Sequence, residues 1–234
     1  MLVLGFDTAT PAVSVALHDG DRVIAEAFAV DARRHSELLM PMITKVMAEA
    51  GAARTELTAV AVGVGPGPYT GLRVGVVTAR VLGSVLGVPV SGVCSLDIMA
   101  AAVLADPVLA DPVLAARPGR EFLVATDARR KEVYWARYDV AGRRLAGPGV
   151  GPASSIPDAA DMAVAGTGGQ LYPEAFGELT GPAYPDAGTL ARLVAGSLAD
   201  PGGFAGPPLL AAEPLYLRRP DAKEPGPPKR VTPA

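Results

Sequence analysis

The stretch that most constrains the fold of this chain is GPGPYTGLRVG, residues 65–75. It lies between two apolar runs, residues 57–63 and 72–86, and this order predicts a buried strand, a tight loop and a helix. Glycine permits positive φ or close backbone approach and proline fixes φ, so the loop is expected to be stiff and structural. Backbone N–H groups at such a helix start can hold an anion, but the Lys-Ser/Thr of a P-loop is missing. The structural glycines of this loop are Gly65, Gly67 and Gly71.

The predicted helix, residues 71–86, is apolar around most of its circumference. A helix this apolar needs cover on more than the side that faces its sheet. The cover could be a second helix of the same domain, a partner subunit, or both, and the alternative is complete burial within its own domain. Helix glycines would let another helix approach closely; they are Gly71, Gly75 and Gly83. The polar residues form one narrow stripe that also includes a valine: Arg73, Val77, Arg80 and Ser84.

Charge and composition narrow the function classes. The 234 residues suffice for one large or two modest domains. A net charge of −3 with scattered basic residues argues against a dedicated nucleic-acid-binding chain. Two short basic clusters, residues 129–131 and 218–219, are expected to be solvated turns.

The sequence also predicts a cytoplasmic protein. No apolar run reaches the roughly 18 residues that would span a bilayer, and Asp7 interrupts the N-terminal apolar run, so no signal peptide is expected. Cys94 is the single cysteine, which excludes an intrachain disulfide and fits a reducing compartment. We expect Cys94 to be a small buried hydrophobe.

The first half of the chain predicts a mixed sheet flanked by helices. Its element order is three strands, helix, strand, helix, strand, helix, which is typical of a ribonuclease-H-like half. Asp19-Gly20 marks a hairpin turn, and Gly51 marks a helix end. The expected strands are residues 2–7, 12–17, 22–30, 57–63 and 88–93, and the expected helices are residues 36–50, 71–86 and 95–104.

The second half repeats the opening pattern and then departs from it. Strands are expected over residues 121–127 and 132–138, and Asp127 and Asp139 have the spacing of Asp7 and Asp19, which suggests a duplicated unit. Residues 145–162 are too rich in glycine and proline for a long helix. A short strand over 162–165, a glycine turn and a final helix over 187–198 complete the reduced second unit. The predicted division is 1–104, a first domain with the interaction helices; 105–119, a linker containing a tandem repeat; 120–219, the reduced second domain; and 220–234, a disordered tail.

Two such halves resemble the sugar kinase–Hsp70–actin superfamily. In that superfamily the hairpins matching residues 7–10 and 127–131 face each other across a nucleotide cleft. Asp7, Thr8 and Thr10 are therefore candidates for contact with phosphate or its magnesium, and Gly166 and Gly168 for an adenosine pocket. The alternative is that Asp7 only caps its loop and that both threonines hydrogen-bond locally.

No metal site or nucleophilic constellation is predicted. The two histidines, His18 and His35, have no partner at helical spacing and no HExxH motif, so both are expected to be surface or capping residues. No Gly-x-Ser-x-Gly elbow is present, and Ser95 is expected to cap a helix.

The whole pattern resembles the TsaB family, also called YeaZ, over residues 1–219. The segments that carry the resemblance occur in the family's order: LVLGFDTATPAVSVAL, RHSELLMPMITKVMAEAG, GVGPGPYTGLRVG, DARRKEVYWARYD and EPLYLRR. The glycine loop and its helix are the most specific of these. The resemblance implies a two-domain ribonuclease-H-like fold whose second domain is reduced.

The resemblance also implies a function. TsaB-like proteins are non-catalytic subunits needed, with the paralogue TsaD, to transfer a threonylcarbamoyl group to N6 of adenosine 37 in tRNAs that read codons beginning with A. It implies a TsaD-like partner, a TsaE-like ATPase, a homodimer when the chain is alone, and tRNA contact only through the complex. The helices expected to pair are residues 36–50 and 71–86, and the expected interface residues are Leu38, Met42, Arg73, Val77, Arg80 and Ser84.

The sequence also leads to an expectation about cofactors and leaves two alternative functions open. No tightly bound cofactor is expected, and ATP or ADP could bind at the interface of the complex. One rival is a nucleotide-dependent kinase-like enzyme, which would need an intact second-domain cleft. The other is a metallopeptidase, for which the sequence offers no metal ligands.

Overall fold

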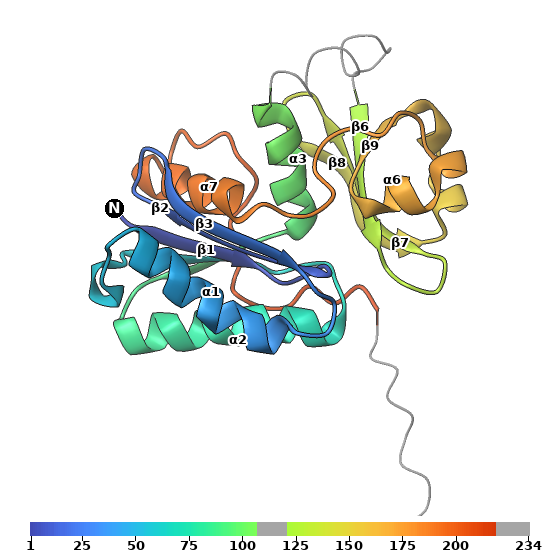
Figure 1. Cartoon of the computed structure of the whole chain (residues 1–234). Helices are drawn as coiled ribbons and strands as arrows, with labels where there is room; N and C mark the ends of the chain where they lie inside the picture. Colours follow the sequence, from blue (N-terminus) through green and yellow to red (C-terminus); the bar gives the residue numbers. More distant parts are fainter. Residues whose placement is uncertain (107–120, 219–234) are drawn as a thin grey trace, which may run out of the picture.

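Two β-sheets, one in each half of the chain, organise the protein (Figure 1). The computed structural model describes residues 1–106 and 121–218. The first sheet has five strands in the order β3-β2-β1-β4-β5, and the second has four in the order β8-β7-β6-β9. The expected linker over 105–119, apart from its first two residues, and the expected tail over 220–234 lie outside the described residues.

The first sheet has the predicted mixed topology. An antiparallel meander is formed by β1 (Val3–Asp7), β2 (Ala12–His18) and β3 (Val23–Val30). On the other side of β1 lie β4 (Ala59–Gly63) and β5 (Val90–Val93), both parallel to it. All residues of β1, β2 and β4 are buried, because helices cover both faces of the sheet. Continuous apolar runs are the expected sequence for such central strands.

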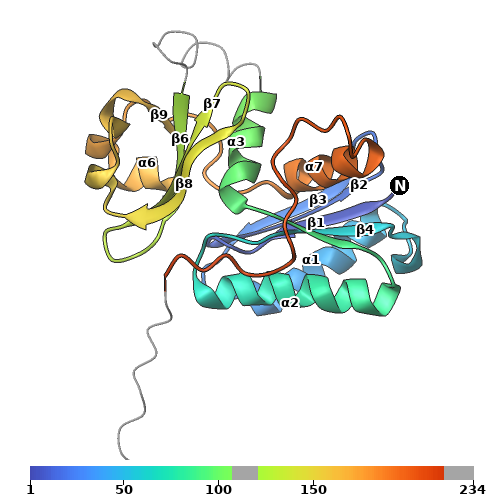
Figure 2. The same ribbon diagram turned by 180° about the vertical axis from the view of Figure 1, so that it is seen from behind.

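Helices α1 (His35–Glu49) and α2 (Tyr69–Leu86) cover one face of this sheet, and α7 (Ala187–Ala199) covers the other (Figures 1 and 2). The face under α1 and α2 is built from large side chains, including Leu4 and Phe6. The face under α7 is built largely from small ones, so that helix lies close to the strands. A Cβ added at Gly5 would lie 2.8 Å from the carbonyl oxygen of Ala187.

The second sheet repeats the arrangement of the first around its leading strand. The strand β6 (Glu121–Asp127) pairs antiparallel with β7 (Val133–Asp139) on one side and parallel with β9 (Ala163–Ala165) on the other. β1 lies in the same way between β2 and β4. The strand–acid–strand repeat predicted from the sequence is therefore a repeat of structure.

A fourth strand, β8 (Arg144–Gly151), was not predicted. It lies at the edge of the second sheet, where proline is tolerated, so Pro148 does not break the ladder. Its glycines make room for a large neighbour: a Cβ on Gly149 would come within 2.9 Å of the Trp135 indole. A short helix, α6 (Thr167–Leu171), replaces the expected glycine turn. The single-turn helices are η1 (Arg54–Glu56), η2 (Ala153–Ser155), η3 (Ala159–Asp161) and η4 (Pro173–Ala175).

Two helices cross between the halves of the chain. α3 (Ser95–Ala105) follows the first sheet in sequence but packs on the second, where Asp97 accepts hydrogen bonds from Tyr138 (2.7 Å) and Arg144 (3.0 Å). α7 follows the second sheet but packs on the first. The predicted domain boundaries at residues 104 and 120 therefore do not coincide with the packing of the helices, because each sheet is covered by one helix from the other half of the chain.

After α7 the chain returns across both halves as a strap, residues 209–218 (Figure 2). Leu210 exchanges two backbone hydrogen bonds with Gly92 of β5, each of 2.8 Å, and the amide of Leu215 donates to the Val64 carbonyl. Arg218 then forms an ion pair with Glu132 and donates to the Ala128 carbonyl of the second half. The strap therefore ties the glycine loop to the β6–β7 hairpin.

The glycines of α2 do not admit another helix, contrary to expectation. Gly71 and Gly75 face the loop after β1. A Cβ added to Gly71 would lie 2.5 Å from the carbonyl oxygen of Thr8, and a Cβ added to Gly75 would lie 2.5 Å from the hydroxyl oxygen of Thr8. A Cβ at Gly83 would lie 2.2 Å from Val90. Glycine is needed because the helix packs directly on a backbone loop and on β5.

We predict that Gly71→Ala destabilises the fold by about 1–3 kcal/mol, because its methyl group would overlap rigid backbone despite the better helix propensity of alanine. Urea denaturation followed by circular dichroism measures this change. Gly202→Ala is the matched control, since an added Cβ there meets nothing within 4 Å, and it should be nearly neutral. Equal stabilities of the two variants would contradict the packing described.

Candidate functional site

A buried serine joins three segments close to the cleft between the two halves of the chain. The Ser95 hydroxyl, at the start of α3, donates to the Asp7 carboxylate (2.5 Å) and accepts from the amide of Gly65 (3.1 Å). The Ser95 amide donates to the Gly65 carbonyl (2.7 Å), and the other Asp7 oxygen accepts from the Ala9 amide (2.8 Å). The end of β1, the glycine loop and α3 are thereby fixed to one another.

Asp7 is engaged in this network rather than exposed to a ligand. Its side chain is buried, both oxygens accept hydrogen bonds, and it does not line the cleft. Burial raises the pKa of Asp7 above 3.8, and the hydrogen bonds from Ser95 and Ala9 only partly oppose that shift. This placement does not match a phosphate contact and corresponds to the alternative in which Asp7 holds its own loop.

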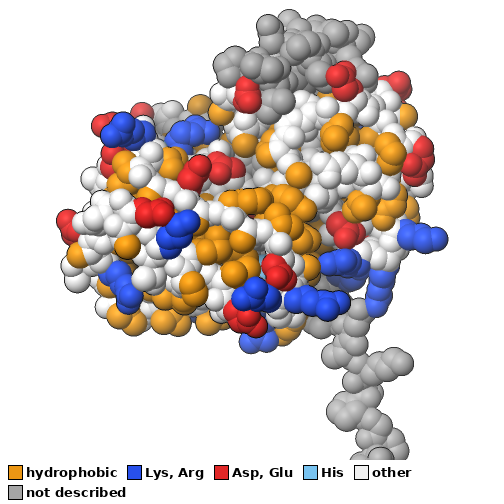
Figure 3. Space-filling model, in the orientation of Figure 1, with side chains coloured by type: hydrophobic (Ala, Val, Ile, Leu, Met, Phe, Trp, Pro, Cys, Tyr) orange, Lys and Arg blue, Asp and Glu red, His pale blue; other side chains and the backbone are white. Residues whose placement is uncertain are grey.

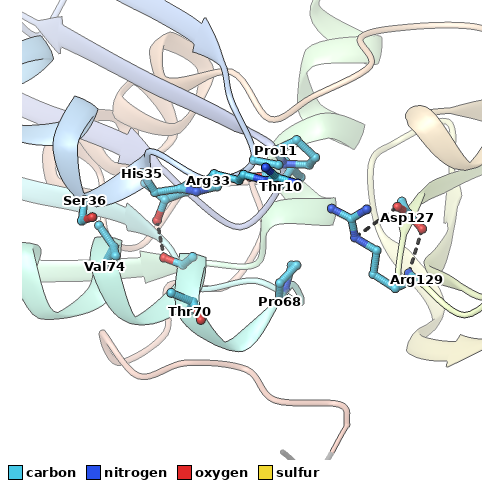
Figure 4. Close-up of a pocket in the computed structure, with 13 residues that line it drawn as sticks. Thr10, Pro11, Arg33, His35, Ser36, Pro68, Thr70, Val74, Asp127 and Arg129 are labelled. Carbon is cyan, nitrogen blue, oxygen red and sulfur yellow. Dashed lines mark hydrogen bonds and ion pairs between the residues drawn. The ribbon is translucent and has the colours of Figure 1, made fainter. Parts of the chain in front are cut away.

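The cleft itself lies between the β1–β2 loop and the β6–β7 hairpin, with a volume of about 230 Å³. Thr8, Thr10 and Thr70 line it from the first half, and Asp127 and Arg129 reach into it from the second (Figure 4). The two hairpins therefore face each other across one cavity. An arginine and several hydroxyls on opposite walls are groups that can bind an oxyanion.

The threonines have specific contacts of their own. The Thr8 hydroxyl donates to the Gly71 carbonyl (2.8 Å), which is a contact between distant segments, while Thr10 accepts from the nearby Ala12 amide (3.3 Å). His35, expected to be a surface or capping residue, places its Nε2 2.7 Å from the Thr10 carbonyl oxygen. The superfamily resemblance had placed the hairpin 127–131 at the cleft, but sequence reasoning did not select His35, Thr70 or Arg129 as site residues, because their side chains come together only when distant segments pack.

Gly166 and Gly168 do not line this cleft. Added Cβ atoms would lie 2.2 Å and 2.7 Å from atoms of Ala125, so both glycines permit close packing of α6 on β6. Thr167 between them accepts a hydrogen bond from the Asp127 amide (3.3 Å). Their predicted role in an adenosine pocket is not supported by this placement.

The described residues contain no group of three or more histidine, cysteine or carboxylate side chains that could hold a metal ion. Cys94 is buried as expected, and burial raises the pKa of its thiol to about 12, so it stays protonated at neutral pH. No helix within the described part of the chain is long and apolar enough to cross a membrane.

A groove between α1 and α2 opens beside the cleft. It has a volume of about 480 Å³, and its walls include Met40, Tyr69 and Val77. The groove and the cleft share Ser36, Thr70 and Val74, so the two cavities adjoin each other. The outer face of α2 is more apolar than the predicted stripe: Val77, Val81 and Val85 are 53%, 54% and 76% exposed.

The expected interface residues divide between this surface and the core. Arg73, Val77, Arg80 and Ser84 are exposed on α2. Met42 is buried in the core under α1, and Leu38 is half-buried against that core. Met42 is therefore a packing residue, because the helical position expected to face a partner faces the sheet.

The fold and cleft define a two-domain ribonuclease-H-like protein. The family model described as "TsaD: tRNA N6-adenosine threonylcarbamoyltransferase" matches residues 23–164. The solved structure of YeaZ from Pseudomonas aeruginosa is 32% identical, with a TM-score of 0.72 over 92% of this chain and 99% of that chain. A second solved structure, titled as an uncharacterized protein with similarity to peptidase YEAZ from Pseudomonas aeruginosa, is 31% identical with a TM-score of 0.74 over 93% of this chain and 99% of that one. The chain belongs to the TsaB (YeaZ) family.

The chain also has sequence relatives, one of which is named as TsaB. The Escherichia coli tRNA threonylcarbamoyladenosine biosynthesis protein TsaB is 36% identical over 138 residues, which is 59% of this chain and 55% of that protein. An uncharacterized protein of Mycobacterium tuberculosis is 42% identical over 94% of this chain and 93% of its own length. A Mycobacterium leprae protein is 45% identical over 95% of this chain, but the match spans only 56% of that protein.

We predict that Ser95→Ala lowers the free energy of unfolding by about 2–4 kcal/mol. The change leaves the buried Asp7 carboxylate and the Gly65 amide without one hydrogen-bond partner each, and each unsatisfied group costs about 1–3 kcal/mol. Denaturant titration gives the value, and Ser84→Ala on the exposed face of α2 is the control. A decrease in the free energy of unfolding below about 0.5 kcal/mol, as for an ordinary surface substitution, would show that this hydrogen-bond network does not stabilise the fold.

Proposed function

We propose that this chain is a non-catalytic subunit of a complex that makes threonylcarbamoyladenosine in tRNA, with a TsaD-like subunit as the catalyst. Membership of the TsaB family supports a role of this chain in that pathway, since relatives are named as tRNA threonylcarbamoyladenosine biosynthesis proteins. The reaction would place the group on N6 of adenosine 37 in tRNAs reading codons that begin with A. The complex would work in the cytoplasm and would include a TsaE-like ATPase.

The observation that carries this proposal is the exposed apolar groove between α1 and α2. Its lining combines the apolar walls of Leu39, Met40 and Val77 with the polar rim of Arg73. An apolar surface bounded by polar residues is typical of a protein-binding site. We propose that it binds the matching helices of a TsaD-like partner, or of a second copy of this chain when that partner is absent.

The cleft is better suited to a shared nucleotide than to a kinase reaction of this chain. Its volume of about 230 Å³ lies below the roughly 300–1,000 Å³ of ordinary ligand pockets. Because the cleft and the α1–α2 groove share Ser36, Thr70 and Val74, a partner bound in the groove would form a further wall of the cleft. ATP or ADP bound at the interface is therefore preferred over the kinase-like alternative, and the metallopeptidase alternative has no supporting ligand cluster among the described residues.

The direct test is reconstitution of the modification reaction. With tRNA, a threonylcarbamoyl donor, the TsaD-like subunit and the TsaE-like ATPase, addition of this chain should give threonylcarbamoyladenosine, detected by mass spectrometry of digested nucleosides. The chain alone should give none. Modification by the chain in the absence of any partner would overturn the proposal.

We predict that Val77→Glu abolishes assembly with the TsaD-like partner while the chain stays folded. A charge buried in the contact costs several kcal/mol, enough to weaken binding by orders of magnitude. Light scattering after size exclusion measures assembly, and thermal melting measures folding. Val140→Glu is the matched control, because Val140 is 38% exposed on the second half, away from the groove. Assembly of Val77→Glu at the wild-type affinity would exclude this surface.

We also predict that ADP binds the isolated chain more weakly than micromolar and gains affinity in the complex. Arg129 supplies the cation on the wall of the cleft that the second half contributes, so Arg129→Gln should weaken binding in the complex by about tenfold, the value of one charge-assisted contact. Isothermal titration calorimetry gives both constants. Micromolar or tighter binding to the chain alone would contradict this account.

A further inference from the structure

A second cavity adjoins the cleft at the β6–β7 hairpin, and Pro68 and Arg129 line both. It has a volume of about 210 Å³ and is lined by the glycine loop, the hairpin and the strap. All charged residues in its lining are cations, Arg129, Arg130 and Arg218. The lining also contains three aromatic residues, Tyr69, Tyr134 and Tyr216. Neither the cleft nor the α1–α2 groove accounts for this combination.

The hairpin concentrates positive charge at one position on an acidic chain. Arg129, Arg130 and Lys131 are consecutive, exposed, and all in the left-handed region, with φ of 63°, 56° and 62°. The strap brings Arg218 to this hairpin, and α2 brings Arg73 to Tyr69. Figure 3 shows Lys and Arg side chains gathered where the hairpin meets the first half. Asp127 and Glu132 offset part of this charge, but the cations are more numerous.

An aromatic platform borders the cations. Tyr69 and Tyr216 stack with their ring centroids 5.2 Å apart and an interplanar angle of 25°, and they are 43% and 40% exposed. The Arg73 guanidinium lies 5.2 Å from the Tyr69 ring and donates to its hydroxyl (2.6 Å). The pair is therefore fixed in place with part of its surface open to solvent.

We propose that this surface, defined by Arg129, Arg130, Lys131, Arg218, Tyr69 and Tyr216, binds an unpaired segment of RNA. Cations contact the phosphodiester backbone, and exposed aromatic rings stack on unpaired bases, which are the two elements of single-stranded recognition. A membrane surface would need cations but no aromatic platform of this geometry. The inference deepens the proposed function: the RNA is the tRNA substrate, and this chain supplies part of its binding site.

The position of the platform relative to the groove supports this assignment. Tyr69 lines both the α1–α2 groove and the second cavity. A subunit seated on the groove would therefore lie next to the RNA-binding surface, and one RNA could contact both proteins. Because the chain has a net charge of −3, we expect this chain alone to bind RNA weakly and with a strong dependence on salt concentration.

The experiment measures fluorescence anisotropy of two labelled RNA probes, a hairpin with an unpaired loop and a fully paired duplex, with the full chain at low salt. Arg130→Gln combined with Lys131→Gln should weaken binding of both probes by about tenfold and lower the salt slope by about two. Arg22→Gln combined with Arg54→Gln removes two exposed cations elsewhere on the chain and should leave binding unchanged.

Substitution of the platform separates stacking from charge. Tyr216→Ala should weaken binding of the hairpin by about tenfold and leave duplex binding unchanged, while Tyr216→Phe should retain both. Thermal melting confirms that each variant is folded. Failure of the wild-type chain to bind the hairpin, or equal binding by the cation variant and its control, would overturn the inference. Equal loss of both probes with Tyr216→Ala would also overturn it, because a disturbed strap rather than stacking would then explain the loss.

The proposed function is tested separately. Assembly with the TsaD-like partner depends on Val77, which is outside this surface. If the chain assembles and activates its partner but does not bind RNA, only this inference fails. If it binds RNA but does not assemble, the proposed function fails instead.

Discussion

The hydrogen bonds around Ser95 are the constraint on which the rest of the structure depends. One hydroxyl connects the carboxylate that ends β1 to the amide that begins the glycine loop. Because α2 starts after that loop and α3 starts at Ser95, the two helices leave the sheet in fixed directions. α3 carries the chain to the second sheet, so the same bonds set how the two hairpins face each other across the cleft.

The glycine loop explains why α2 has two different faces. Its glycines lie against the Thr8 loop, where no side chain would fit, and this contact holds the helix close to the sheet. Valines occupy the opposite face and remain exposed. The close packing that fixes the helix therefore leaves its apolar outer surface uncovered and next to the cleft. A partner bound there would close the groove and one side of the cleft together.

Much of the fold could be predicted from the sequence, because its strands and helices carry strong local signals. The apolar runs that became β1 and β4 are continuous, as expected for strands buried on both faces, and the glycine loop precedes the run that became α2. The acids that end β1 and β6 indicated the duplication. Edge strand β8 was missed, since its glycines and Pro148 are explained only by the neighbouring Trp135 and by its position at the sheet edge.

The site was less accessible to sequence reasoning because it depends on contacts between distant segments. Asp7 has the position of a phosphate-binding residue in the chain, yet Ser95, 88 residues away, occupies its carboxylate. Residues 129–131 were expected to form a solvated turn, although the superfamily resemblance placed this hairpin opposite residues 7–10. The structure adds that the Arg129 side chain itself lines the cleft. Met42 fits an interface pattern, but the orientation of α1 directs it into the core.

The central claim is that the α1–α2 face is the surface by which this chain activates a TsaD-like subunit. Hydrogen–deuterium exchange of the chain, alone and with that subunit, tests the claim most directly. The account predicts slower exchange in α1 and in α2, with the strongest effect around the exposed valines and at most small changes in β3 and β8. Protection confined to β3, β8 or the second sheet, with α1 and α2 unchanged, would contradict it.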